Sequence, residues 1–279
     1  MTEAVVVASA LGSAMAAASS SVLQHRSARK APAVHARAGR LLGHLATRPD
    51  WLLGLVFAAV GLGLHTYALA GGRLAIVQPL LVCGVLFALP ASVALEGRRP
   101  SATQWLWGVA LLAGLLVFLL TARPSPGRVS IDADVLAVTT AVGVVVAGAV
   151  ALIGLRWPHG HQAALLATAA GIGYGLVAAL LKQNAALAAN GPAAVLGDWP
   201  LYVLLAVGAV TLSLTQHAYR AGPLSGSLPA LTVSDPAASV AIGALAFHEH
   251  LAHSPGAVLL EALAFAVMGL ATARLALAD

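Results

Sequence analysis

The stretch VLAVTTAVGVVVAGAVALIGL, residues 135–155, decides the fold class of this chain. It contains no charged residue; Asp132 and Asp134 precede it and Arg156 follows it. About 20 consecutive apolar residues are enough for a helix to cross the hydrocarbon core of a bilayer. The stretch is continuously apolar rather than alternating, and an open sheet in lipid would leave backbone groups unsatisfied at its edges. We therefore expect a membrane-spanning helix here rather than a strand.

Similar stretches follow one another along the whole chain. Of its 279 residues, 59% are hydrophobic and 9% are charged, whereas soluble domains carry about 25% charged residues. The sequence therefore predicts an all-α polytopic membrane protein with about nine spans, in a single membrane domain that covers residues 1–279. The predicted spans, each bounded by charge, proline or glycine, are 4–23, 51–70, 74–95, 103–121, 135–155, 163–187, 199–218, 224–247 and 256–275.

The distribution of basic residues predicts the orientation. Loop 24–50 is basic, with Arg26, Arg29, Lys30, Arg37, Arg40 and Arg48. Because cytoplasmic loops carry an excess of Lys and Arg, we expect this loop on the cytoplasmic side of a bacterial plasma (inner) membrane. The N-terminus would then lie outside and the C-terminus in the cytoplasm. Glu3, rather than a positive charge, precedes the first span, which predicts a retained helix and not a cleaved signal peptide.

The net charge of +5 is thus explained by topology, with no need for a nucleic-acid partner. The expected partners are the lipid bilayer and a small solute or ion, and a second copy of the chain is a further candidate. No cofactor is expected.

The two halves of the chain carry similar short motifs in the same order. The matched motifs are His65-Thr66-Tyr67 with His217-Ala218-Tyr219, Gln78-Pro79 with Leu228-Pro229, and the pair Gly12 and Gln24 with the pair Gly171 and Gln183. Residues 4–121 would then form a first repeat of four spans, 163–275 a second, and 135–155 a connecting helix. Matched spans are five apart, an odd number, so the second repeat is inverted relative to the first. Inverted repeats are typical of many secondary transporters.

Several of these motifs resemble the drug/metabolite transporter (EamA-like) superfamily, and most of all its nine-span NIPA-like magnesium-transporter branch. The residues that carry the resemblance are Ser19-Ser20-Ser21, Leu74 to Pro79, Glu96-Gly97-Arg98-Arg99, Gly173 to Lys182, Gln216-His217-Ala218-Tyr219 and Gly226-Ser227-Leu228-Pro229. Asp235-Pro236 and His248-Glu249-His250 depart from the pattern. The resemblance implies a transporter that moves a small solute by alternating access, with a divalent cation such as Mg²⁺ or a small metabolite as substrate.

Asp235 is the most informative single residue because it lies about midway along the predicted span 224–247. A charged side chain at the bilayer centre costs about 3 kcal/mol or more unless it meets partners or water. Pro236 follows it and Pro229 precedes it, and proline frees helix carbonyls that can coordinate a ligand or flex. The two interpretations are a coupling-proton or cation site, and a protonated Asp bonded to a neighbouring helix.

Other polar residues within the spans have both a functional and a structural interpretation. Lys182 would attract an anionic substrate or pair with Asp235, or else extend to the outer headgroups; Gln78 would bind a ligand or a neighbouring helix. The predicted substrate- or ion-binding residues are Asp235, Gln78, Pro79, Lys182, Gln183, Gln216, Pro229 and Ser234. Asp235 and Glu261 are the carboxylates that a metal ion would use inside the membrane.

The histidines favour structural roles. His65 and His217 lie near predicted span ends, each two residues before a Tyr, so interfacial anchoring is expected rather than substrate contact. His248 and His250 are two residues apart and would point to different sides of a helix, so a polar outer turn is favoured over a metal site.

The glycines of Gly171-Ile172-Gly173-Tyr174-Gly175 are expected to permit close helix packing. With no catalytic constellation visible, we expect no enzyme activity. The predicted function is a secondary transporter or permease; the alternative is a non-transporting membrane assembly or lipid-handling protein.

Overall fold

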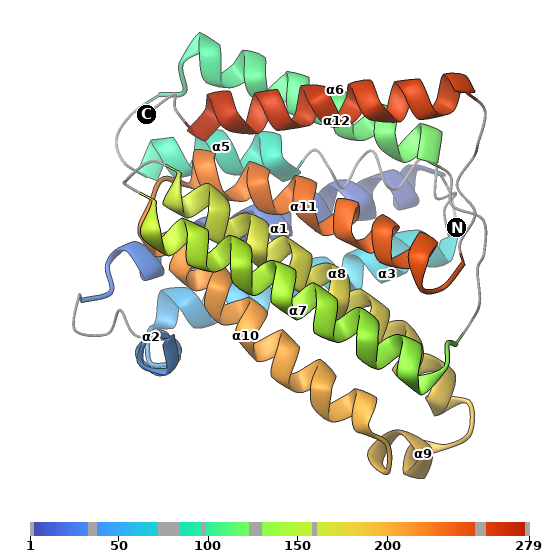
Figure 1. The fold of residues 1–279 in the computed structure, drawn as a ribbon. Coiled ribbons are helices and arrows are strands. Elements are labelled where there is room, and N and C mark those ends of the chain that lie inside the picture. The colour runs from blue at the N-terminus through green and yellow to red at the C-terminus, as the bar shows by residue number, and fades with distance from the viewer. Residues whose placement is uncertain are drawn as a thin grey trace.

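The computed structural model describes residues 3–32, 38–71, 84–95, 99–122, 130–157, 161–248 and 255–276. Within these ranges every regular element is a helix and no strand occurs (Figure 1), which confirms the all-α fold class. The helices are α1 (Glu3–Arg29), α2 (Ala38–Leu45), α3 (Pro49–Gly71), α5 (Gly84–Leu95), α6 (Ala102–Ala122), α7 (Ala133–Arg156), α8 (Gln162–Ala188), α9 (Pro192–Leu196), α10 (Trp199–Ala221), α11 (Leu224–Leu245) and α12 (Pro255–Ala276).

Each of the nine predicted spans contains a helix, but only six helices of the described chain are long and apolar enough to cross a membrane. These six are α1, α7, α8, α10, α11 and α12. Two further apolar helical stretches, Pro49–His65 in α3 and Ala102–Phe118 in α6, are shorter than these six. The third predicted span, 74–95, is described only from Gly84 onward. The described chain therefore has the composition of a polytopic helical membrane protein, and the number nine stays a prediction.

The helices pack in two groups, one in each half of the sequence. In the first half, α1 packs against α3 and α5. In the second half, α8 packs against α10 and α11, and α7 lies along α8 (Figure 1). The halves meet where α12 pairs with α6 and where α1 contacts α10. Because contacts also join the two halves, they do not mark a boundary within the predicted single domain. The inverted symmetry of the two halves stays a prediction.

Glycines in α8 allow its close approach to α10 and α11. A Cβ atom added to Gly175 would lie 2.7 Å from the Cβ of Ala238, and one added to Gly171 would collide with the Ser234 hydroxyl. A Cβ atom added to Gly173 would likewise collide with the side chain of Thr211 on α10. The predicted packing role of these glycines is therefore confirmed.

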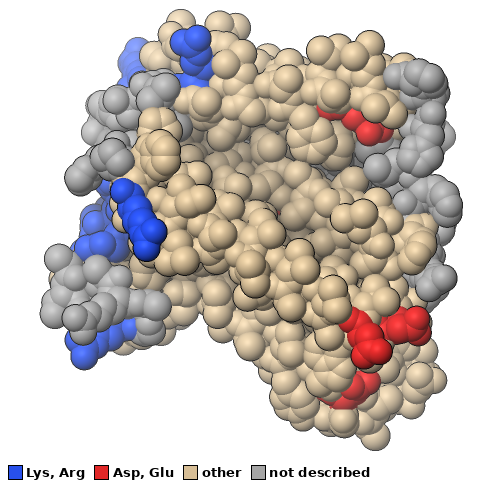
Figure 2. All heavy atoms as spheres, in the orientation of Figure 1, with Lys and Arg blue, Asp and Glu red and all other residues tan. Residues whose placement is uncertain are grey.

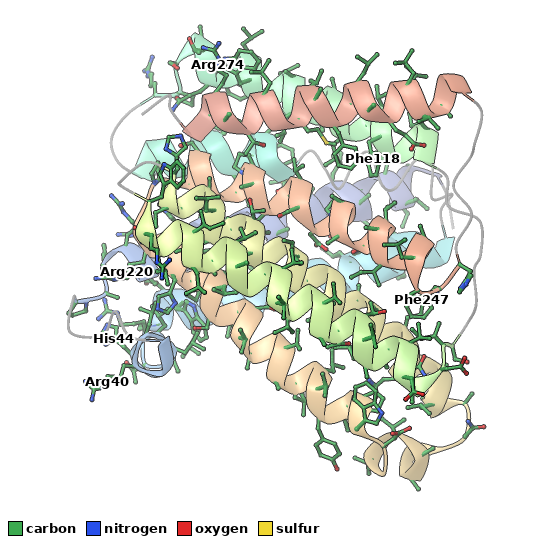
Figure 3. The ribbon with its side chains drawn as sticks, viewed as in Figure 1. Arg40, His44, Phe118, Arg220, Phe247 and Arg274 are labelled. Atoms are coloured by element: carbon green, nitrogen blue, oxygen red, sulfur yellow. The ribbon has the colours of Figure 1, made fainter. Side chains whose placement is uncertain are left out.

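On the face shown in Figure 2, the Lys and Arg side chains of the described residues lie at one end of the helix bundle and the Asp and Glu side chains at the other, with an uncharged surface between them. Arg40, Arg220 and Arg274 mark the basic end in Figure 3. The helix α1 begins near the end marked N and α12 finishes near the opposite end, marked C (Figure 1).

The uncharged surface between the ends is strongly apolar. On α7, Val138, Val145 and Leu152 are each more than half exposed. Soluble monomers rarely expose large contiguous apolar patches, so these side chains indicate a lipid environment.

Candidate functional site

A cavity of about 640 Å³ lies between α1, α3, α6, α8, α10 and α11. The helices of both halves contribute to its wall. Its polar lining residues are Ser13, Ser20, Ser21, Gln24, His65, Tyr174, Thr215, Tyr219, Thr232 and Asp235. Among the described residues that line it, Asp235 is the only Asp, Glu, Lys or Arg. A cavity of this size falls within the range of about 300–1,000 Å³ that small-molecule sites occupy.

Asp235 is half-buried in the middle of α11. Its nearest polar partner is Ser239, one turn further along, whose hydroxyl lies 3.4 Å from Asp235 Oδ1. Pro236 has no amide hydrogen to donate to the carbonyl of Thr232, the acceptor it would reach in a regular helix. Thr232 also lines the cavity. The interrupted turn of α11 thus places a carboxylate beside a backbone segment with a freed carbonyl.

Tyr174 and Thr215 line the cavity from the second half of the chain. Thr215 Oγ1 lies 3.5 Å from the Tyr174 hydroxyl and donates to the carbonyl of Thr211 at 2.9 Å. The side chain of Tyr219, which is also part of the cavity wall, packs edge-on against the buried ring of His25. These contacts supply hydroxyl donors and acceptors together with aromatic surface.

A buried chain of hydrogen bonds joins three helices behind the wall. Gln24 donates to Ser20 Oγ at 2.8 Å and accepts from Gln216 Nε2 at 2.7 Å, and Trp51 Nε1 donates to Gln216 Oε1 at 3.1 Å. Gln216, predicted to bind substrate, is fully buried and does not line the cavity. The Gln216 amide instead orients the side chain of Gln24, which lines the cavity.

Lys182 and Gln183 lie in the C-terminal part of α8. The Gln183 amide is bonded to both backbone groups of Ile131, with its Oε1 accepting from the N–H and its Nε2 donating to the carbonyl, each at 3.1 Å. Lys182 Nζ lies 4.2 Å from the centroid of the Phe247 ring. Neither side chain lines the large cavity.

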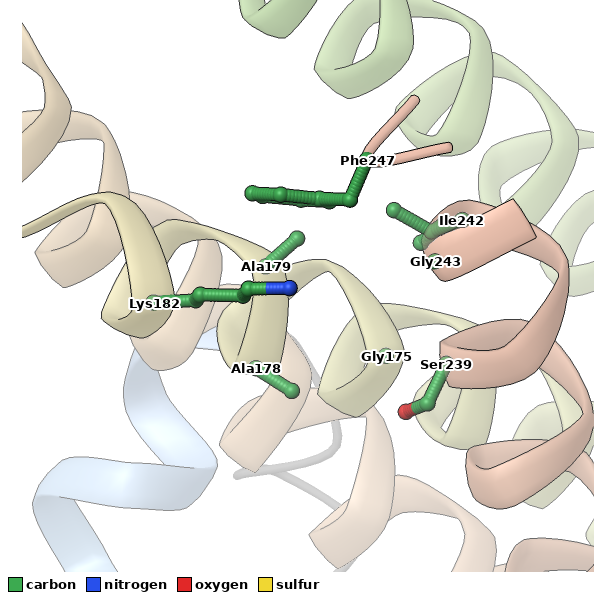
Figure 4. A pocket seen from close by; sticks show the side chains of 8 residues that line it. All are labelled: Gly175, Ala178, Ala179, Lys182, Ser239, Ile242, Gly243 and Phe247. Carbon is green, nitrogen blue, oxygen red and sulfur yellow. The ribbon is translucent and has the colours of Figure 1, made fainter. Parts of the chain in front are cut away.

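Lys182 and Phe247 line a second, smaller pocket of about 180 Å³ between α8 and α11 (Figure 4). Ser239 lines this pocket too, and its hydroxyl is the one that approaches Asp235. The small pocket and the large cavity therefore lie on either side of the Asp235–Ser239 contact.

The other predicted binding residues lie elsewhere. Ser234 Oγ donates to the Ala230 carbonyl at 2.7 Å, and Pro229 is buried within α11; neither lines the large cavity. The Oε1 atom of Glu261 is buried on α12 without a hydrogen-bond partner in the described chain, away from the cavity wall. Gln78 and Pro79 lie outside the described residues, as do Glu249, His250 and His253. In the described ranges, no group of three or more His, Cys, Asp or Glu side chains could hold a metal ion.

Two parts of the cavity were missed by the sequence interpretation. His65 lies on the cavity wall, where the sequence interpretation favoured interfacial anchoring over substrate contact. On α1, the lining residues Ser13, Ala17, Ser20 and Gln24 recur at intervals of three and four. This spacing places them on one helix face, and the small polar stripe was visible in the sequence.

Comparison with known proteins gives one relative over most of the chain. The chain is 31% identical over 242 residues, which are 86% of its length, to the uncharacterized protein Cgl0250/cg0304 of Corynebacterium glutamicum. The aligned region also covers 83% of that protein. No family model matches the chain, and no solved structure matches it. These comparisons do not link the chain to the drug/metabolite transporter superfamily, and that resemblance stays a prediction.

Proposed function

The chain belongs to the same family as the corynebacterial protein Cgl0250/cg0304, and we propose that it is a secondary transporter that moves a small solute or ion across the plasma membrane. The observation that carries this proposal is the cavity of about 640 Å³ with Asp235 on its wall, halfway along a helix that is long and apolar enough to span the membrane. A carboxylate in such a position is expensive to keep without a role, and it usually marks an ion or substrate pathway.

Paired contacts support an inverted repeat. The contacts of α1 with α3 and α5 are matched by those of α8 with α10 and α11. The α5–α6 contact is matched by α11–α12, and α6 packs against its own proposed counterpart, α12. A two-fold axis in the membrane plane that passes between α6 and α12 would relate these pairs. Alternating access would then consist of rocking the two repeats around the cavity.

The distribution of charge supports the orientation. With the basic end of the bundle in the cytoplasm, the N-terminus lies outside and the C-terminus inside. In this orientation the large cavity runs from the middle of the membrane toward the cytoplasm, since Gln24 and Tyr219 lie near the basic ends of α1 and α10. The small pocket at Lys182 and Phe247 lies on the outer side of Asp235.

The alternative, a non-transporting assembly or lipid-handling protein, needs neither a carboxylate in mid-membrane nor a polar cavity shared by both halves. The resemblance to magnesium transporters keeps Mg²⁺ among the substrates to be tested, beside small metabolites. Of the two carboxylates that the sequence offers to a metal ion inside the membrane, Asp235 lines the cavity and Glu261 does not, so Asp235 would be the carboxylate ligand there.

Flux into proteoliposomes tests the proposal. Labelled Mg²⁺ and a panel of cationic, anionic and neutral metabolites are offered to vesicles that hold the wild-type chain, Asp235→Asn or Glu261→Gln. We expect at least one solute to cross with the wild-type chain and with the Glu261 control. Asp235→Asn should slow that flux about tenfold or more, since it removes a charge-assisted interaction. A wild-type chain that moves none of the solutes would favour the alternative. An Asn variant as fast as the wild type would show that transport does not depend on Asp235.

A further inference from the structure

We infer that the solute bound in the large cavity is a small monovalent organic cation. This inference rests on the proposed transport function and names the class of substrate that the cavity would take.

Charge balance is the first argument. Asp235 is the only Asp or Glu among the described residues that line the cavity, and no Lys or Arg is found among them. A solute with a single positive charge leaves the occupied site neutral. A divalent ion leaves an excess positive charge, and an anion adds a second negative charge beside the carboxylate. Uncompensated charge is strongly disfavoured away from water.

The chemistry of the wall is the second argument. Mg²⁺ requires an octahedral shell of oxygen ligands at about 2.0–2.1 Å and is held in proteins by carboxylates and retained waters. Much of this cavity wall is apolar instead, with Leu62, Leu115 and Leu231 among its residues. Such a surface suits the hydrocarbon part of an organic molecule better than a hydrated ion.

Aromatic groups are the third argument. Tyr174 and Tyr219 both line the cavity, on different helices from Asp235. The faces of aromatic rings attract alkylammonium groups, and together with a carboxylate they form the usual surroundings of quaternary ammonium ligands. The Lys182 ammonium is directed to the Phe247 ring in the other pocket and does not occupy this site.

A matched pair of ligands isolates the contribution of charge. Choline and 3,3-dimethylbutan-1-ol have the same shape, but only choline is positively charged. Their binding to the purified full chain in detergent is measured by isothermal titration calorimetry, together with tetramethylammonium, tetraethylammonium and MgCl₂. The same titrations are made with Asp235→Asn and with Glu261→Gln, whose carboxylate lies away from the cavity wall.

We expect at least one of the ammonium ions to bind to the wild-type chain and to the Glu261→Gln control. Asp235→Asn should weaken that binding by about 30-fold or more, as expected when one member of a buried charge pair is lost. Choline should bind better than its neutral isostere. The inference is overturned if none of the ammonium ions binds, if the neutral isostere binds as well as choline, or if Mg²⁺ binds at Asp235 in preference to all of them.

Failure of this inference and failure of the proposed function are separable. If an anion, a neutral solute or Mg²⁺ crosses proteoliposomes in an Asp235-dependent manner while no ammonium ion binds, transport stands and the substrate class is wrong. If an ammonium ion binds at Asp235 but no solute crosses, the class of ligand stands and transport is wrong.

Discussion

Asp235 and Gln183 are both polar side chains in helices that are apolar enough to span a membrane, but their surroundings give them different chemistry. Asp235 has one long contact, to Ser239, and faces a cavity. Gln183 uses both ends of its amide to hold the backbone of Ile131, just before α7. The Gln183 amide therefore has a structural role, whereas the Asp235 carboxylate is available to a ligand in the cavity.

We therefore predict that Gln183→Ala lowers stability and leaves function in place. Two buried backbone groups of Ile131 would lose their partner, at a cost of about 1–3 kcal/mol. Thermal unfolding of the purified variant measures the loss, and the initial flux per folded molecule should match that of the wild type. Normal stability combined with lost flux would return Gln183 to the binding site.

At the residue scale, the sequence singles out a side chain whose burial in the membrane would cost much free energy. Asp235 could be picked out in this way because a carboxylate in the middle of an apolar span is rare and energetically unfavourable. The same reasoning could not separate Gln216, bonded behind the wall, from Gln24, which lines the cavity. Glutamine serves equally well as a ligand and as a link between helices, and only the three-dimensional partners distinguish these roles.

The helix pair α8 and α11 is the element on which the site depends, since it carries Tyr174 and Asp235 and contributes to the walls of both pockets. At Gly171, an added Cβ would lie 2.9 Å from the amide nitrogen of Asp235 and would collide with the Ser234 side chain. The backbone of α11 can therefore keep its place only if residue 171 has no side chain.

Gly171→Ala should consequently destabilise the chain by about 1–3 kcal/mol, because overpacking forces the helices apart. Gly148→Ala on α7 is the matched control, since a Cβ there has no neighbour within 4 Å. That control should be neutral or stabilising by up to about 1 kcal/mol, from the helix propensity of alanine. Equal melting temperatures for the two variants in detergent would contradict the close packing of α8 and α11.

Hydropathy predicts spans well and short helices poorly. Every predicted span contains a helix, but α2 and α9 were not predicted. In α2, Leu41 and Leu45 are one turn apart and fully buried, while Arg40 is exposed. A helix of eight residues with two buried leucines lacks the sustained apolar run that a search for spans detects.

At the scale of the whole molecule, the basic side chains on the face shown in Figure 2 lie at the opposite end from the acidic ones, and this predicts the orientation. A reporter fused after Asp279 should read cytoplasmic, and a reporter placed at the N-terminus should read extracytoplasmic. A periplasmic signal from the C-terminal fusion would overturn the orientation and, with the N-terminus outside, the odd number of spans. The inverted repeat could be suggested from the order of motifs, but the contacts between its helices are non-local and follow only from the fold.

The central claim, that the cavity at Asp235 opens in turn to both sides of the membrane, is tested most directly by the accessibility of Thr232. Thr232 lines the cavity, and Cys83 is the only cysteine of the chain, so Thr232→Cys in a Cys83→Ala background provides a unique thiol there. Val145→Cys on the exposed apolar face of α7 is the control. The measurement is the rate of modification by a charged, membrane-impermeant methanethiosulfonate added to one side of sealed vesicles of known orientation. We predict that Thr232→Cys reacts from either side, that a saturating transported solute slows the reaction, and that the control does not react. Reaction from one side only, under all solute conditions, would contradict alternating access.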